Sequence, residues 1–374
     1  MTHRERFYAV LHGEQADRIP FIARIELWFE SAAARNKLPD EYRGMTMWEF
    51  MREMGFGLYG RAAKVFSRQL KGVEIGKHQD GDILRTEFHT PVGVVRKAER
   101  TLENLRDSGA QRYVVEYPFK TDADYDVLAW IFENITFESV HGEWEAQERE
   151  IGEDGISRAN ASPCPLQEIM VNWMGDERAI YEFHDHPEKM ERLIGILTES
   201  YRQMHRIVLD SPADIVLTGA NFTTMITSPP LFRQYFLPYF VGFNSKLIER
   251  GKIPMAHTDG ELGGGLMPLI PESRFRIADA FTPPPMTSVT VREALDTWGD
   301  KVMVFGGIPS VMLSPTVSDS EFESYVINLL RSISRQDRFV LGIGDTTPPE
   351  ADFERIQLMS RLYAGYGGYS RNYH

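Results

Sequence analysis

The strongest constraint on the fold is a regular alternation of short apolar segments with amphipathic segments, which begins at about residue 150. The apolar segments have the length and composition of buried strands, and the segments between them have the spacing of helices. Strands are predicted over residues 214–217, 253–257, 275–281, 301–305 and 339–342. Such alternation produces a parallel sheet joined by right-handed crossovers. With a first strand over residues 18–25, about eight strand candidates are present, so a closed (β/α)8 TIM barrel is favoured over an open sheet.

Residues 73–117 depart from this alternation, because they contain short strands of polar-alternating character joined by tight turns. Asp80-Gly81 is a strong hairpin signal, since glycine supplies the positive φ that such turns need. The strands are expected over residues 73–78, 83–89 and 94–101. We therefore predict one domain over residues 1–374, with about 73–117 as an inserted β-hairpin or meander.

Composition excludes several classes of protein. Asp and Glu total 54 against 41 Lys and Arg, which gives a net charge of -13, whereas a general nucleic-acid binder needs a basic face. No stretch approaches the roughly 20 apolar residues that span a bilayer. The one cysteine, Cys164, cannot form an intrachain disulfide. We expect a cytoplasmic protein that acts on a small molecule and binds neither nucleic acid nor membrane.

Polar side chains follow several predicted strands. His257 and Asp259 come at the end of the 253–257 strand, two residues apart, so that an extended backbone directs them to the same side. Asn221, Asp279 and Asp345 lie at or just past other strand ends. Because chemistry in a TIM barrel takes place where the strands end, all five are expected to converge on one mouth.

These residues have structural as well as catalytic interpretations. His257 and Asp259 suit metal ligation or acid–base catalysis, but a hydrogen-bonded pair at the barrel rim is the alternative. Asp279 has small neighbours that leave room for a ligand, and it could equally be satisfied by loop amides. Asn221 could orient a substrate. Asp345 could cap the final helix, expected over residues 349–363, instead of binding a ligand.

An ordered series of short motifs resembles the uroporphyrinogen decarboxylase superfamily over roughly residues 155–365. The motifs are Ser162-Pro163, Ser228-Pro229-Pro230-Leu231-Phe232, His257-Thr258-Asp259-Gly260, Gly306-Gly307-Ile308-Pro309 and Gly344-Asp345-Thr346-Thr347-Pro348-Pro349. The resemblance implies either cofactor-free decarboxylation or methyl transfer with corrinoid proteins, as in coenzyme M methyltransferases and O-demethylases. True decarboxylases have an arginine-rich segment after the first strand. This chain has the acidic and aromatic segment 25–30 there, so it is closer to the methyltransferase branch.

The methyltransferase branch holds zinc with a His-x-Cys pair and a second, distant cysteine. Here His257 keeps the first position, Asp259 stands at the first cysteine, and Asp345 lies near the second. The resemblance thus implies a metal set of His257, Asp259 and Asp345. An oxygen-rich set binds zinc less tightly than thiolates do and accepts other divalent ions.

The leading hypothesis is a methyltransferase that moves a methyl group between an ether or amine donor and the cobalamin-type corrinoid of a partner protein. His257, Asp259, Asp279 and Asn221 are its predicted catalytic residues, and Trp28, Gly306 and Gly307 its predicted cofactor-binding residues. One alternative is a uroporphyrinogen-type decarboxylase in which a carboxylate such as Asp279 binds pyrrole N–H groups. Another is a non-catalytic tetrapyrrole- or corrinoid-binding module. The resemblance also suggests a homodimer.

Overall fold

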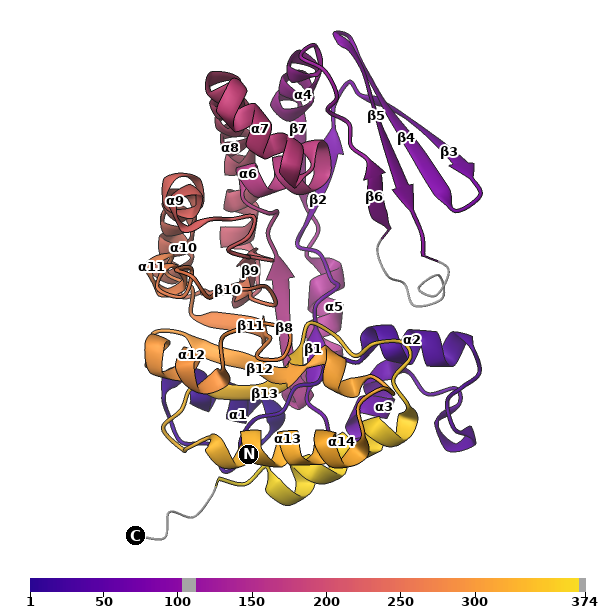
Figure 1. Ribbon diagram of the computed structural model, residues 1–374, viewed down its shortest axis with the longest axis vertical. Coiled ribbons are helices and arrows are strands. Elements are labelled where there is room, and N and C mark those ends of the chain that lie inside the picture. Colours follow the sequence, from indigo (N-terminus) through magenta and orange to yellow (C-terminus); the bar gives the residue numbers. More distant parts are fainter. Residues whose placement is uncertain (103–111, 370–374) are drawn as a thin grey trace.

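The computed structural model describes residues 1–102 and 112–369. Its centre is a curled parallel sheet of seven strands in the order β1-β8-β9-β10-β11-β12-β13 (Figure 1). Each strand is short and buried, as expected where helices cover the outside of a parallel sheet. The strands are Leu58–Gly60 (β1), Gly155–Asn160 (β8), Ile215–Gly219 (β9), Ile253–His257 (β10), Ile277–Phe281 (β11), Met303–Pro309 (β12) and Phe339–Gly344 (β13).

A short extended segment closes the gap between the two outer strands of this sheet. Phe21 forms a parallel bridge with Leu341 of β13, and Ile22 forms one with Gly57, which precedes β1. The backbone N–H of Leu341 donates to the carbonyl of Pro20 at 2.8 Å. Residues 20–22 therefore occupy the position of the eighth strand of the barrel. The predicted TIM-barrel class is confirmed.

This N-terminal extended segment is much shorter than the strand predicted over residues 18–25. Pro20 has no N–H to donate, and the chain turns into helix α2 (Glu26–Ala34) soon after Ile22. Glu26 and Trp28 thus belong to a helix that begins one residue after the end of the predicted strand. The prediction was wrong here because proline and an early helix start limit strand pairing to two residues.

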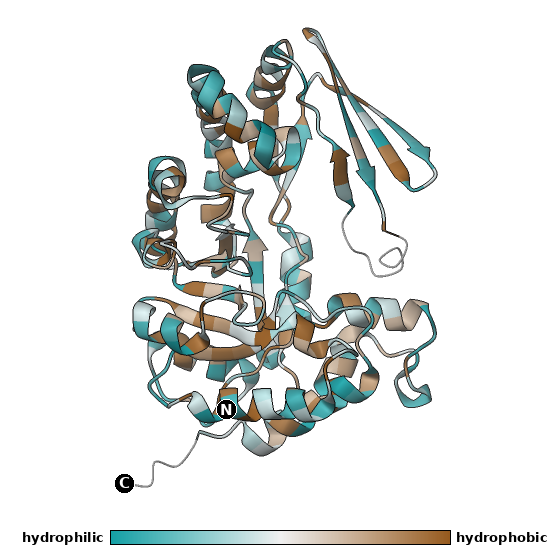
Figure 2. Ribbon diagram, viewed as in Figure 1, coloured by the Kyte–Doolittle hydropathy of each residue, from teal (hydrophilic) through white to brown (hydrophobic). Residues whose placement is uncertain are grey.

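The helices pack around the barrel and bury their apolar faces against it, while their outer faces are hydrophilic (Figure 2). Pro187 starts α8 (Pro187–Asp210) and separates it from the helix before it. None of the helices within the described residues is long and apolar enough to cross a bilayer. The other helices are α1 (His3–His12), α3 (Met47–Glu53), α4 (Asp124–Glu133), α5 (Gly142–Ile151), α6 (Pro165–Glu168), α7 (Asp176–Asp185), α8 (Pro187–Asp210), α9 (Pro229–Leu231), α10 (Leu237–Glu249), α11 (Leu269–Glu272), α12 (Val291–Trp298), α13 (Asp319–Ser332) and α14 (Phe353–Tyr366).

A separate antiparallel sheet forms the region expected as an insertion. Its strand order is β3-β4-β5-β6, and it stands to one side of the barrel, at the upper right of Figure 1. A two-stranded antiparallel pair, β2 and β7, lies beside it. The strands are β2 (Phe66–Leu70), β3 (Glu74–Asp80), β4 (Ile83–Thr90), β5 (Gly93–Arg100), β6 (Tyr113–Glu116) and β7 (Ile135–Ser139).

The barrel interior has two layers of inward-facing side chains. The lower layer is apolar and is closed from below by α1, whose Phe7 ring lies 6.1 Å from that of Phe305. Because side chains alternate along a strand, residues two positions further on face the upper layer, except that Phe305, two positions after Met303, belongs to the lower cluster. The lower layer contains Ile22, Tyr59, Ile156, Ile215, Met255, Ile277, Met303 and Val340.

Candidate metal centre

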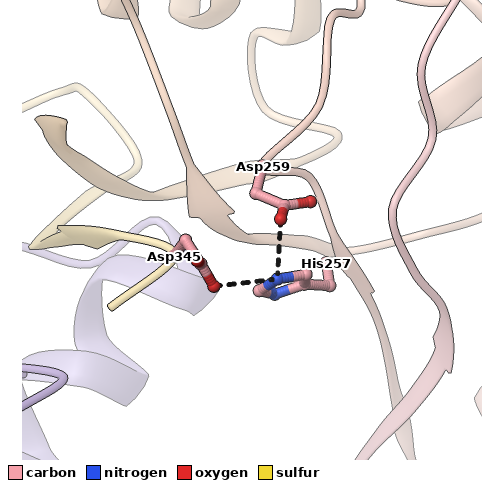
Figure 3. A group of neighbouring side chains, drawn as sticks. All are labelled: His257, Asp259 and Asp345. Atoms are coloured by element: carbon pink, nitrogen blue, oxygen red, sulfur yellow. Dashed lines mark ion pairs between the residues drawn. The ribbon is translucent and has the colours of Figure 1, made fainter. Parts of the chain in front are cut away.

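His257, Asp259 and Asp345 meet at the barrel mouth (Figure 3). His257 is the last residue of β10, Asp259 follows it by two positions, and Asp345 follows directly after β13. His257 Nε2 lies 3.5 Å from Asp259 Oδ2 and 3.9 Å from Asp345 Oδ1. One ligand atom from each residue lies within 4.8 Å of the other two. The three residues that the resemblance implied as ligands are therefore neighbours in space.

Asp279 lies behind the imidazole rather than in the mouth. It is opposite His257 in the β10–β11 register, its side chain is fully buried, and its Oδ2 lies 3.2 Å from His257 Nδ1. An ionised carboxylate can only accept a hydrogen bond, so Nδ1 carries a proton. Nε2 is the ring nitrogen that faces Asp259 and Asp345. A carboxylate behind a histidine is a common way to orient a metal ligand.

The protonation states follow from the same contacts. Burial opposes a charge on His257, but hydrogen bonds to Asp259 and Asp279 outweigh burial and raise its pKa. Burial favours the neutral acid at Asp279, yet the hydrogen bond with His257 and the charge of Arg24 hold its pKa well below the usual value. The pKa of Asp259 is also lowered, because its hydrogen bond with His257 outweighs burial. Both aspartates are therefore anionic at neutral pH.

Local backbone geometry sets the position of Asp345. Its φ is +66°, in the left-handed region that few non-glycine residues adopt. It does not cap the final helix, since the N-cap of α14 is Asp352. Its side chain remains 47% exposed and directs Oδ1 toward His257. Backbone strain of this kind is found at functional sites more often than elsewhere.

The three residues fit a divalent ion. Ligand atoms about 2.1 Å from a tetrahedral zinc ion are about 3.4 Å apart, close to the 3.5 Å and 3.9 Å observed here. Asp259 Oδ1 is buried and has no hydrogen-bond partner among the described residues, although such an oxygen needs one. One imidazole nitrogen and two carboxylates suit zinc and also manganese or iron.

The predicted residues outside this cluster are placed differently. Asn221 is exposed, and its backbone N–H donates to the carbonyl of His257 at 3.1 Å. Trp28 is 2% exposed and its Nε1 donates to the carbonyl of Ala351 at 2.7 Å. A Cβ on Gly306 would lie 2.3 Å from the carbonyl oxygen of Phe281. Close packing accounts for the positions of Trp28, Gly306 and the buried Gly307. Their positions therefore give no support to the predicted cofactor-binding role.

Three arginines that were not among the predicted site residues lie on adjoining strands of the mouth, and Arg24 Nη2 lies 3.7 Å from Asp345 Oδ1. Arg24, Arg61 and Arg158 each come two positions after a lower-layer residue. Those residues are Ile22, Tyr59 and Ile156, on three neighbouring strand positions of the barrel. The guanidinium carbons of Arg61 and Arg158 lie 5.8 Å and 5.6 Å from the centre of the Tyr59 ring. Period-two alternation in three strands would have indicated them, but only once those strands had been aligned in the barrel.

The comparisons with known proteins agree with this fold. A model of the uroporphyrinogen decarboxylase family matches residues 161–366, more than half of the chain. No curated protein sequence matches. Among solved structures, a methyltransferase from Methanosarcina mazei superposes with a TM-score of 0.60 at 13% identity, covering 98% of this chain and 99% of that one. At this identity the likeness establishes the fold alone.

Two other structures are similar over smaller parts. A broad-specificity endoglucanase from an uncultured bacterium is 10% identical, with a TM-score of 0.32 over 65% of this chain and 78% of that one. The spore cortex-lytic enzyme of Bacillus megaterium is 10% identical, with a TM-score of 0.30 over 62% and 63%. Such low scores do not bear on this chain. The extent of the family match shows that the chain belongs to the uroporphyrinogen decarboxylase family.

Proposed function

We propose that this protein is a methyltransferase that moves a methyl group from a small methylated ether or amine to the corrinoid of a partner protein. The observation that carries this proposal is the orientation of His257. Asp279 holds Nδ1 from behind at 3.2 Å, which leaves Nε2 facing Asp259 and Asp345 at the open end of the barrel. A decarboxylase that needs no cofactor has no use for this arrangement.

His257, Asp259 and Asp345 would hold a divalent ion, with Asp279 fixing the imidazole tautomer. When bound, such an ion would act as a Lewis acid on the heteroatom of the methyl donor while that heteroatom loses its methyl group. The protein contributes a rigid and largely water-free setting. His257 is only 8% exposed and Asp279 is fully buried, so their orientation does not have to be established during the reaction.

The likeness of the fold to a methyltransferase over 98% of the chain supports this assignment. A corrinoid is too large to enter the buried part of the barrel, so the acceptor would approach from the mouth, where Asp345 is half-exposed. The methyl group would then pass outward, from a donor held near His257 to an acceptor at the rim.

The experiment is a methyl-transfer assay with cob(I)alamin as acceptor and a panel of simple methyl ethers and methylamines as donors. We expect His257→Ala to reduce the rate by about 100-fold or more, because the loss of Lewis-acid assistance costs several kcal/mol. His184→Ala is the matched control, since His184 has a side chain that is 87% exposed. Unchanged transfer by His257→Ala contradicts the proposal, as does metal-free formation of coproporphyrinogen from uroporphyrinogen by the wild-type protein.

A further inference from the structure

A second, basic cavity lies at the N-terminal ends of the barrel strands, at the opposite end of the barrel from the metal centre. It has a volume of about 320 Å³, and residues at the C-terminal ends of α1 and α10 form part of its wall. Its lining includes the four cationic residues Lys252, Arg276, Lys301 and Arg338, and no acidic residue among those that the structure describes.

The four cations come from equivalent places on four neighbouring strands. Lys252, Arg276 and Arg338 directly precede β10, β11 and β13, and Lys301 precedes β12 by two residues. The carbonyls of Arg276 and Arg338 both accept backbone hydrogen bonds from β12, each at 2.9 Å. Because neighbouring strands are about 4.8 Å apart, the fold gathers four like charges at one edge of the barrel.

Two of these cations have partners that the protein itself supplies. Lys252 Nζ donates to the carbonyls of Ser211 and Ala213, each at 2.7 Å. Arg338 Nη1 donates to the carbonyl of Leu11 at 2.8 Å, near the C-terminal end of α1, where a positive charge is stabilising. These bonds use two of the three N–H groups of a lysine and one of the five of an arginine, so both side chains keep further donors.

Arg276 and Lys301 have no such partners. Neither forms an ion pair or a side-chain hydrogen bond with the residues that the structure describes, and both are exposed. Asp300 precedes Lys301 in the sequence but does not line the cavity. Like charges gathered around one cavity repel one another, and no contact of Arg276 or Lys301 offsets that repulsion.

The acidic residues nearby leave most of this charge unbalanced. Asp337 directly precedes Arg338 in the sequence, but it pairs with Arg292 at 2.9 Å. Asp214 does act on the cavity, since its charge opposes the burial that lowers the pKa of Lys252. Three of the four cations are therefore without a paired carboxylate among the described residues.

This concentration of positive charge stands out because the whole chain has a net charge of -13. Phosphate groups match it chemically, since arginine binds their oxygens through its N–H groups and lysine binds them as a point charge. A cavity of about 320 Å³ has the size of a small-molecule site. Apolar lining residues such as Leu11 and Ile253 can contact the organic part of a ligand.

We propose that this cavity binds a phosphate-bearing small molecule, with Arg276 and Lys301 in contact with the phosphate oxygens and Lys252 and Arg338 adding positive charge. Three unpaired cations call for an anion with more than one negative charge, so a diphosphate group is the expected recognition element. The inference does not depend on the proposed methyl transfer, because the two sites lie at opposite ends of the barrel.

The first test is calorimetric titration with inorganic pyrophosphate at fixed ionic strength. We expect one pyrophosphate per wild-type chain, and affinities about 10-fold weaker in Arg276→Gln and in Lys301→Gln, because each loses a charged hydrogen-bond donor. Lys71→Gln is the matched control, since Lys71 is an exposed lysine between β2 and β3. Pyrophosphate also chelates divalent ions, so the titration is repeated with His257→Ala, which should bind it as the wild-type protein does.

The second test separates a binding role from a structural one. Without ligand, Arg276→Gln and Lys301→Gln relieve repulsion and should melt at the wild-type temperature or above it. Pyrophosphate should raise the melting temperature of the wild-type protein, because it binds the folded state, and should raise that of the two variants less. Lower melting temperatures of both ligand-free variants would show that the two cations are structural, and would overturn the proposal.

Other outcomes would also overturn it. They are absence of binding by the wild-type protein, unchanged affinity in both variants, and an equal loss of affinity in Lys71→Gln, which would trace binding to overall charge. A poly-glutamate peptide that binds as tightly as pyrophosphate would show that this face recognises acidic chains and not phosphate. None of these results bears on methyl transfer, which is tested at the other end of the barrel.

Discussion

The two layers of the barrel interior differ in chemistry although they lie only two residues apart on the same strands. The lower layer is apolar and packs around Tyr59, Met255 and Phe305. In the upper layer, five of the eight strand positions carry an ionisable side chain. The steps from lower to upper layer are Ile22 to Arg24, Tyr59 to Arg61, Ile156 to Arg158, Met255 to His257 and Ile277 to Asp279.

This difference shows how one set of strands serves both stability and chemistry. Apolar side chains in the lower layer need only close packing, which the covering helix α1 completes. Charged side chains in the upper layer need partners, and their arrangement decides what the mouth can bind. A TIM barrel follows this division in general, with stability at one end and catalysis at the end where the strands finish.

The largest effect should come from the lower layer. Met255→Ala removes a side chain that is fully buried, so we expect the free energy of unfolding to fall by about 2–5 kcal/mol. Urea denaturation followed by circular dichroism measures it. Metal content per folded chain should stay the same in Met255→Ala, because the metal ligands lie in the upper layer. A folded Met255→Ala protein that binds no metal would show that the two layers do not have separate roles.

A smaller and more specific effect is expected at Asp279. Asp279→Asn keeps the size of the side chain but removes the acceptor that fixes the His257 tautomer, so affinity for the metal should fall by about 10- to 100-fold. Competition with a chelator of known affinity measures this change. Unaltered affinity would mean that Asp279 has only a structural role and would weaken the case for the upper layer as a metal site.

Histidines inside and outside the site should respond to pH in opposite directions. His205 lies in an apolar environment against Phe243, with its Nε2 2.9 Å from the Tyr239 hydroxyl. Burial lowers the pKa of His205 to about 3. The unfolded chain therefore binds a proton near pH 6.5 that the folded chain does not, and stability falls as the pH drops below 6.5.

The loss attributed to His205 is at most about 1.4 kcal/mol by pH 5.5. His205→Gln keeps a hydrogen-bonding group for Tyr239 and should flatten this part of the curve. Metal-free His257 has a raised pKa, so its contribution is fully present below pH 6.5 and is lost as the pH rises through the folded pKa. A pH curve that His205→Gln leaves unchanged would place the titrating group elsewhere.

Local patterns in the sequence predicted much of the barrel. The strand 253–257 has the predicted bounds, because polar residues flank its apolar run on both sides. The first strand was overestimated, since apolar residues next to Pro20 do not show how few of them pair. The strand Ile135–Ser139 and the helix Gly142–Ile151 were not predicted at all.

The site was predictable in part. A polar pair after an apolar strand identified His257 and Asp259, and the resemblance to the family added Asp345. The role of Asp279 was not visible, because its burial and its contact with His257 depend on the β10–β11 register. The placement of the arginines was not visible for a similar reason: the burial of Arg24 and its contact with Asp345 are properties of the packed barrel and not of its neighbours in sequence.

The most direct test of the account is elemental analysis of the purified wild-type protein beside His257→Ala and His184→Ala. The account predicts about one divalent ion per chain in the wild-type and His184→Ala proteins, and little or none in His257→Ala. Absence of metal from the wild-type protein after incubation with zinc, manganese or iron(II), or equal metal content in all three proteins, would contradict the assignment of His257, Asp259 and Asp345 as a metal centre.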